Sequence, residues 1–138
     1  MAYLLDTCTL SDGAKSFASL SLLSWLERMP EEERYVSAVS LGEIMFGIFR
    51  LPLGKKRTTL SVWYDEILSP IYEGRILPFG DREAMIWAQL RSQYRNSDLI
   101  DSQIAATAIA HNLTLVTRNV KDFAFAGLSL INPWSSEG

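Results

Sequence analysis

Short apolar segments alternate with longer segments of helical periodicity along this chain. Apolar runs bounded by turn residues are typical of strands, and apolar residues spaced three and four apart are typical of helices. The predicted strands cover residues 3–5, 35–39, 74–79, 113–117 and 128–131. The predicted helices cover residues 19–29, 40–51, 58–68, 81–94 and 100–111, with Ser40 opening the second of them and a basic loop at residues 55–57.

Strands that alternate with helices favour βαβ units and a parallel sheet covered by helices. The pattern therefore predicts the α/β class, with a mostly parallel sheet of four to five strands flanked by helices. With 138 residues, the chain is long enough for one domain with a substantial core. In open sheets of this kind, ligands bind outside the carboxyl ends of the strands.

Composition narrows the classes of protein that fit. The hydrophobic fraction of 48% is ordinary for a globular protein, and no apolar run approaches the roughly 18 residues of a membrane span. The start of the chain has no basic segment followed by a long apolar one, so no secretory signal is expected. A single cysteine excludes an internal disulfide and fits the cytoplasm. The net charge of −3 argues against a protein that coats nucleic acid through a basic surface.

Acidic and amide residues follow the ends of the predicted strands. Asp6 ends the first strand, Glu43 lies in the first turn of the helix after the second, and Asn119 and Asp122 follow the run LTLVT. Asp101 opens the helix before that run, on the face that carries its apolar residues. The four acids are therefore expected to converge on one edge of the sheet.

Converging carboxylates repel one another, so they persist as anions only around a cation. Two of them about 4 Å apart cost roughly 4 kcal/mol at an effective dielectric constant near 20. Oxygen ligands alone suit Mg²⁺ or Mn²⁺, whereas zinc favours the His and Cys side chains of which the chain has one each. Such a site suits phosphoryl chemistry, because the ion lowers the pKa of a bound water and neutralises charge on the phosphate.

Each acid also has a structural interpretation. The run SLGE at residues 40–43 matches a capping box, and DLID at residues 98–101 can be interpreted in the same way. Asp6 can form an Asx turn, and Asp122 can cap a following turn. Capping and metal binding are compatible, since a carboxylate at the start of a helix can serve both.

Four segments of the chain form a recognisable set, in this order over nearly its whole length: YLLDTCTLSD, YVSAVSLGEIMFGI, DSQIAATAIAHNLTLVTRNVKDF and INPW. Together they resemble the PIN-domain family, and within it the VapC and FitB type toxins of bacterial toxin–antitoxin pairs. The resemblance implies a three-layer PIN fold and a Mg²⁺-dependent endoribonuclease that cleaves RNA with a metal-activated water. It also implies a homodimer, neutralised by a small antitoxin protein and assembled with it on DNA.

The resemblance assigns the ligands residue by residue. Asp6 matches the first ligand acid, Glu43 the second and Asp101 the third, while Asn119 and Asp122 both fall in the region of the fourth. Of these two, Asp122 is expected to matter more, because only Asp122 adds negative charge.

Two threonines and one departure from the family pattern complete the predicted site. The family often has Asn two places after the first Asp, where this chain has Cys8. Thr7 and Thr117 are expected to hydrogen-bond the acids or a scissile phosphate. The helix at residues 40–51 is apolar on more than one face, which predicts a groove for an amphipathic helix of a partner.

Two other functions fit the same residues. The acids can be caps only, in a binding module that completes a DNA-binding repressor complex with its antitoxin. A different Mg²⁺ phosphohydrolase on an α/β sheet would instead act on small phosphate esters and leave RNA intact.

Overall fold

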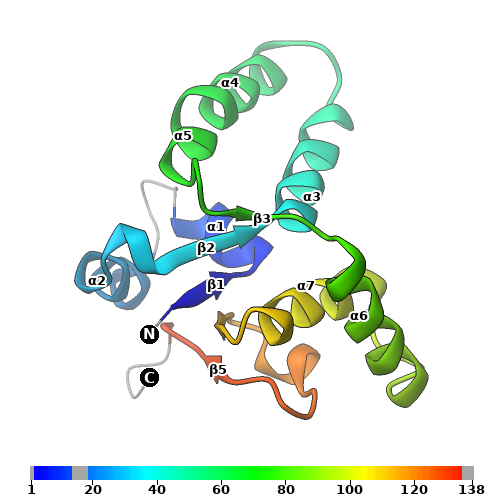
Figure 1. Ribbon diagram of the computed structural model, residues 1–138. Coiled ribbons are helices and arrows are strands. Elements are labelled where there is room, and N and C mark those ends of the chain that lie inside the picture. The colour runs from blue at the N-terminus through cyan, green and yellow to red at the C-terminus, as the bar shows by residue number, and fades with distance from the viewer. Residues whose placement is uncertain (1, 14–18, 135–138) are drawn as a thin grey trace.

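The computed structural model describes residues 2–13 and 19–134, which form a sheet with helices on both faces (Figure 1). Within these residues five strands make one parallel sheet, in the order β3-β2-β1-β4-β5. The α/β class and the parallel sheet predicted from the sequence are confirmed. The strands are β1 (Tyr3–Leu5), β2 (Arg34–Ser37), β3 (Ile76–Leu77), β4 (Thr114–Val116) and β5 (Leu130–Ile131).

The helices follow the predicted ones, with one addition and one extension. Residues 7–13 form a helix that the pattern does not predict, and residues 55–57 are the first turn of a helix rather than a loop. The longer helices are α1 (Thr7–Gly13), α2 (Leu20–Arg28), α3 (Ala38–Phe49), α4 (Lys55–Trp63), α6 (Asp81–Gln93) and α7 (Leu99–Ala110). The short helical segments are η1 (Glu31–Glu33), the π-helical η2 (Tyr64–Leu68), α5 (Ser69–Ile71) and η3 (Val120–Phe123).

The start of α3 differs from the prediction. The helix begins at Ala38 because the Ser37 side chain caps it, accepting a hydrogen bond from the Val39 N–H at 3.0 Å. The predicted cap, Ser40, lies inside the helix, where its buried hydroxyl has no hydrogen-bond partner among the described residues. The capping box of residues 40–43 is therefore wrong, and Glu43 lies in the second turn of α3.

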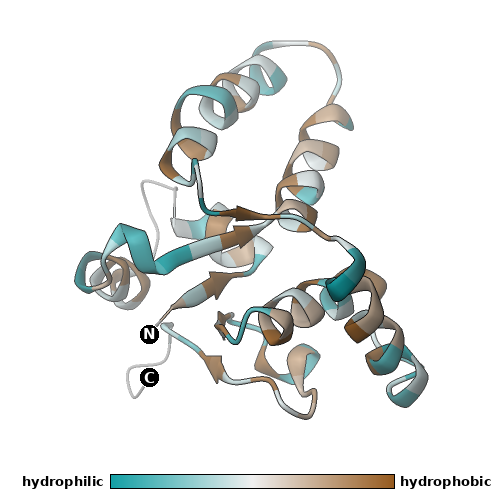
Figure 2. Ribbon diagram, in the orientation of Figure 1, coloured by the Kyte–Doolittle hydropathy of each residue, from teal (hydrophilic) through white to brown (hydrophobic). Residues whose placement is uncertain are grey.

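Alternate side chains of the strands enter two separate cores, one on each face of the sheet. Leu4 of β1 and Leu115 of β4 pack with α6 and α7, whereas Leu5 and Val116 pack with α1, α2 and α3 on the other face. This alternation is the two-residue period of a strand. Because both faces are covered, apolar residues on both faces make up most of β1 and β3, whereas β2 begins with the polar Arg34 (Figure 2).

Helix α7 lies close against the sheet because its inward face carries small residues. Ala105, Ala106 and Ala108 are fully buried, and Ile104 is 1% exposed. The face predicted to be buried, one turn after Asp101, is confirmed. At the other end of α7, the imidazole of His111 lies 3.2 Å from the carboxylate of Glu83 on α6.

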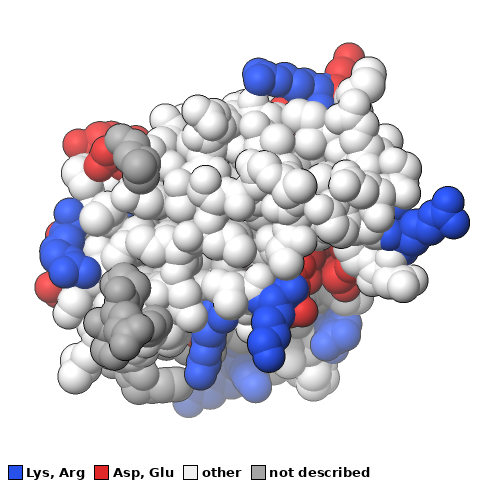
Figure 3. All heavy atoms as spheres, turned by 90° about the horizontal axis from the view of Figure 1, so that it is seen from below, with Lys and Arg blue, Asp and Glu red and all other residues white. Residues whose placement is uncertain are grey.

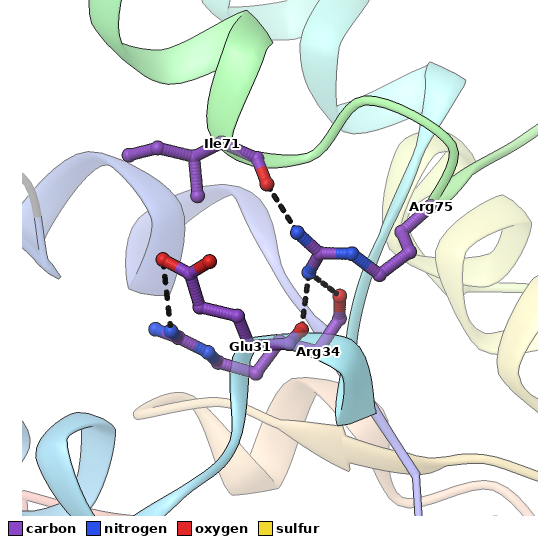
Figure 4. A network of polar contacts seen from close by, with 4 residues as sticks. All are labelled: Glu31, Arg34, Ile71 and Arg75. Carbon is purple, nitrogen blue, oxygen red and sulfur yellow. Dashed lines mark hydrogen bonds and ion pairs between the residues drawn. The ribbon is translucent and has the colours of Figure 1, made fainter.

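One arginine holds together the elements at the amino ends of the neighbouring strands β2 and β3. The Arg75 guanidinium donates hydrogen bonds to the backbone carbonyls of Glu31, Arg34 and Ile71, and the Arg34 guanidinium in turn faces the Glu31 carboxylate at 3.8 Å (Figure 4). The contacts join the residue before β3 to η1, β2 and α5. The opposite, carboxyl edge of the sheet carries the acidic residues.

Candidate metal centre

Asp6 lies directly after β1 and is almost fully buried, with 3% of its surface exposed. Its Oδ1 accepts hydrogen bonds from the Thr9 N–H at 2.8 Å and the Thr9 hydroxyl at 2.6 Å. Its Oδ2 accepts one from the Thr117 hydroxyl at 2.6 Å. These three donors replace the water that the buried carboxylate has lost. Asp6 is thus the cap of α1 and, at the same time, a carboxylate held rigidly at the carboxyl edge of the sheet.

Glu43 reaches the same edge from α3. The Thr7 hydroxyl donates a hydrogen bond to Glu43 Oε1 at 2.5 Å, which joins the first residue of α1 to the second turn of α3. Because Ser37 caps α3, the Glu43 carboxylate has no capping function and faces α1 instead. Thr7 and Thr117 thus each hydrogen-bond one of the predicted acids.

Asp101 lies in the first turn of α7, which is capped by Asp98. The Asp98 Oδ1 accepts a hydrogen bond from the Asp101 N–H at 2.9 Å, so the capping interpretation of residues 98–101 is confirmed. The Asp101 side chain is partly buried and its pKa is raised to about 6. Partial burial is the largest cause, followed by the negative charges of Asp98, Asp122, Glu43 and Asp6, in that order.

That pKa is the clearest sign that the predicted acids share one site. Each of the three other predicted ligands, from the end of β1, from α3 and from η3, lies near enough for its charge to hinder ionisation of Asp101. The convergence expected from the strand ends therefore brings the four acids into one electrostatic environment.

The fourth position is split between two side chains with different surroundings. The Asn119 N–H donates to the Thr117 hydroxyl at 3.0 Å, and the Asn119 side-chain amide points to the sulfur of Cys8 at 3.8 Å. Asp122 is exposed on η3, with its backbone N–H donating to the Asn119 carbonyl at 3.0 Å. Of Asn119 and Asp122, only Asp122 is among the charges that raise the pKa of Asp101.

The donors fit a hard dication that keeps much of its own water. Among residues 2–13 and 19–134, no three His, Cys, Asp or Glu side chains lie in positions that would hold a metal ion as they stand. Zinc is disfavoured because its preferred ligands are not in place. The imidazole of His111 lies at the far end of α7. Partial burial and nearby acids raise the pKa of the Cys8 thiol, which disfavours the thiolate that zinc needs. Carboxylate oxygens with mutual repulsion fit Mg²⁺ or Mn²⁺, which need few protein ligands.

Thr9 is the one supporting residue of this site that the sequence analysis does not name. It donates twice to Asp6, and its hydroxyl also lies 3.0 Å from the Val116 carbonyl, so it links the end of β1 to β4. The spacing D-x-x-T is its sequence signal, since Thr three residues after an N-terminal Asp can donate back to it.

Two cavities adjoin the acids of the candidate site. The face shown in Figure 3 carries a group of acidic side chains with lysine and arginine side chains on either side. One cavity, of about 550 Å³, lies between α1, α3 and α4 and is mostly apolar, with Thr7 and Glu43 in its lining. A second, of about 460 Å³, is lined by Asp101 and Asp122 and extends away from them under the connection between α6 and α7.

Comparison with known proteins identifies the family. The PIN domain profile matches residues 3–126. The VapC ribonuclease Y4jK of Sinorhizobium fredii is 35% identical over 134 residues, which cover 94% of this chain and 96% of that protein. Toxin FitB of Neisseria gonorrhoeae is 35% identical over 135 residues, covering 95% of this chain and 97% of the toxin. The chain belongs to the PIN-domain family.

A solved structure agrees with this assignment over the whole chain. The structure of FitAB bound to an IR36 DNA fragment contains a chain that superposes with a TM-score of 0.88 at 34% identity, covering 99% of this chain and 98% of that one. The three-layer PIN fold implied by the resemblance is confirmed.

Proposed function

We propose that this protein is a Mg²⁺- or Mn²⁺-dependent endoribonuclease that acts as the toxin of a toxin–antitoxin pair. The observation that carries the proposal is the group of acids at the carboxyl edge of the sheet. Threonine hydroxyls hold Asp6 and Glu43 there, and the charges of these acids and of Asp122 contribute to the raised pKa of Asp101. Acids placed so that they oppose one another's ionisation are typical of a site that a dication completes. Membership of the PIN-domain family and the ribonuclease and toxin names of the two relatives support the same function.

In this proposal, Asp6, Glu43 and Asp101 hold the ion and Asp122 is the fourth acid. A bound Mg²⁺ would lower the pKa of a coordinated water and neutralise charge on the phosphodiester. The acids act as ligands, and no covalent bond forms between enzyme and RNA. Asp101 must lose its proton to serve as a ligand, while the threonines at residues 7, 9 and 117 keep Glu43 and Asp6 oriented.

The proposed partners are RNA, a small antitoxin and DNA. The related FitAB structure holds DNA, and we extend that assembly to this chain.

The apolar cavity beside Glu43 suits an amphipathic helix of the antitoxin. Its apolar lining is formed by Ile44, Ile48, Leu60 and Trp63. The exposed side chains of Phe46 and Phe49 extend this apolar surface on α3. A homodimer in the cytoplasm completes the proposal. No helix in the described part of the chain combines the length and apolarity needed to cross a membrane.

The test is cleavage of single-stranded RNA by the purified protein across a Mg²⁺ titration. Asp6→Asn and Asp101→Asn should abolish cleavage with the fold intact by circular dichroism, because each removes a charged ligand oxygen. Asp65→Asn is the matched control, since Asp65 is exposed on η2 and is not among the charges that act on Asp101. Cleavage at the wild-type rate by either site variant would contradict the proposal.

The same experiment separates the alternative functions. A binding module that completes a repressor would leave RNA uncut at every Mg²⁺ concentration and still shift operator DNA together with its antitoxin. A phosphohydrolase of small substrates would release phosphate from simple esters and leave RNA intact.

A further inference from the structure

The cavity beside Asp101 and Asp122 has a lining unlike that of the apolar cavity on α3. It is formed by the connection between α6 and α7 on one side and by η3 with the residues after it on the other. Its volume of about 460 Å³ lies within the roughly 300–1,000 Å³ of small-molecule sites. Since two of the proposed metal ligands form one end of it, a molecule in this cavity lies against the metal centre.

The walls of this cavity are held in place by contacts on both sides. The Arg91 guanidinium donates to the Ser97 carbonyl, and the Ser97 hydroxyl donates to the Tyr94 carbonyl at 2.7 Å, which fixes the turn between α6 and α7. The Tyr94 hydroxyl accepts from the Ala126 N–H at 2.9 Å, and its ring meets Phe125 edge-on at 5.1 Å between centroids. The α6–α7 connection and the segment after η3 are thus joined, so the cavity is preformed.

The lining also carries the groups that recognise a nucleotide. Arg95 and Lys121 contribute cations, and neither forms an ion pair with any residue that the structure describes. Gln93 and Asn96 contribute amides that can donate and accept hydrogen bonds, and Tyr94 contributes an aromatic surface. Cations for phosphates, amides for base edges and a ring for the base are the means by which proteins bind single-stranded RNA.

We propose that this cavity is the subsite for the RNA nucleotide next to the cleaved phosphodiester. Arg95 and Lys121 hold backbone phosphates there, and the Asn96 amide contacts the base edge and so influences which sequences are cut. The assignment of RNA rests on the proposed ribonuclease function. A purely apolar partner is disfavoured, because Asp98, Asp101 and Asp122 line the same space. These carboxylates also oppose a phosphate, so the RNA backbone must lie against Arg95 and Lys121.

The experiment compares two arginines of the same helical hairpin. Arg95→Ala removes a cation from the cavity, whereas Arg82→Ala removes one from the first turn of α6, outside the lining. Binding of fluorescein-labelled single-stranded RNAs of about 12 nucleotides is measured by anisotropy in EDTA at several salt concentrations. Arg95→Ala should weaken binding and reduce the slope of log K against log salt by about 0.7, the value of one phosphate contact on a single strand. Arg82→Ala should leave the slope unchanged.

Asn96→Ala tests the contact with the base. With RNA oligomers that differ at one position, this variant should change the ratio of kcat/KM between the best and worst sequences by about tenfold. Its binding averaged over sequences should change little, because it removes no charge. The matched control is Asn112→Gly, which removes an exposed amide at the far end of α7 and suits the positive φ of 55° at that position.

The outcomes separate the subsite from the proposed function. If the wild-type protein cuts RNA but Arg95→Ala behaves like Arg82→Ala and Asn96→Ala keeps the wild-type sequence ratios, the subsite is wrong and the ribonuclease stands. If the predicted effects appear in binding but no RNA is cut at any Mg²⁺ concentration, the cavity binds RNA and the ribonuclease is wrong. Absence of both binding and cleavage overturns both.

Discussion

Replacing Asp101 by Asn should stabilise the metal-free protein, and only above a defined pH. The folded state raises the pKa of Asp101 from 3.8 to about 6, so it holds the proton more tightly than the unfolded chain does. The contribution of Asp101 to stability is therefore fully present below about pH 4 and is lost as pH rises through about 6, where the folded carboxyl must ionise among other acids. Asn is neutral at every pH and does not carry this penalty.

The size of the effect follows from the pKa and from the exposure of the group. A difference of about two pKa units corresponds to about 3 kcal/mol. Because Asp101 is only partly buried, solvent screens much of this, and we expect about 1 kcal/mol in favour of Asp101→Asn at pH 8. For a chain of this size, that is a rise in Tm of about 2–4 °C.

The assay is thermal unfolding in EDTA at pH 4, 6 and 8, followed by circular dichroism. The Tm values of the wild-type protein and Asp101→Asn should differ little at pH 4, and the difference in Tm should grow between pH 4 and 6. Addition of Mg²⁺ at pH 8 should stabilise the wild-type protein more than the variant and so narrow the gap. Asp65→Asn serves again as the control and should show no such pH dependence. A variant no more stable than wild type at pH 8 in EDTA would refute the reasoning, because repulsion at Asp101 would then be absent.

Four further predictions test individual contacts. Asp122→Ala should reduce Mg²⁺-dependent RNA cleavage more than Asn119→Ala does. Asn119→Ala should lower the cleavage rate by about 10–100-fold. If Asn119→Ala is inactive and Asp122→Ala is fully active, the order of importance of the two residues is reversed. Thr9→Val should lower the free energy of unfolding in urea by about 1–3 kcal/mol, because Asp6 loses a buried donor. Ser40→Ala should leave stability unchanged or raise it by up to about 1 kcal/mol, because the hydroxyl has no partner among the described residues; a clear loss would show a partner. Arg75→Ala should cost about 2 kcal/mol in the same urea assay, and Arg75→Lys should recover only part, since an ammonium cannot match the planar fork.

The sheet and most helices are predictable because parallel strands buried on both faces leave a plain apolar signal. Helix α1 cannot be predicted in this way, since its sequence, TCTLSDG, contains several poor helix formers. It forms because Asp6 caps it and because Thr9 and Leu10 are buried against the rest of the fold. The sequence pattern also places the start of α3 wrongly. Ser37 and Ser40 are both good helix caps by residue type, and Ser37 is the cap in the structure because β2 ends there.

The candidate site is predictable in its acids but not in its surroundings. Strand ends of a parallel sheet share an edge, which is sufficient to group Asp6, Glu43 and Asp101. The nucleotide-sized cavity depends instead on the path of the connection between α6 and α7, which Arg91 and Tyr94 fix through contacts with backbone groups. No periodicity in the sequence reports such contacts.

The central position of β1 has a consequence for biosynthesis. This strand lies between β2 and β4, and the hydrogen bond from Thr117 to Asp6 spans 111 residues of chain. While the protein is being translated, one edge of β1 therefore lacks its neighbour, and the buried Asp6 lacks one of its donors, until the ribosome has passed β4. Asp122 emerges later still. Prematurely terminated products that end before β4 lack both Thr117 and Asp122, so they cannot complete the acidic centre.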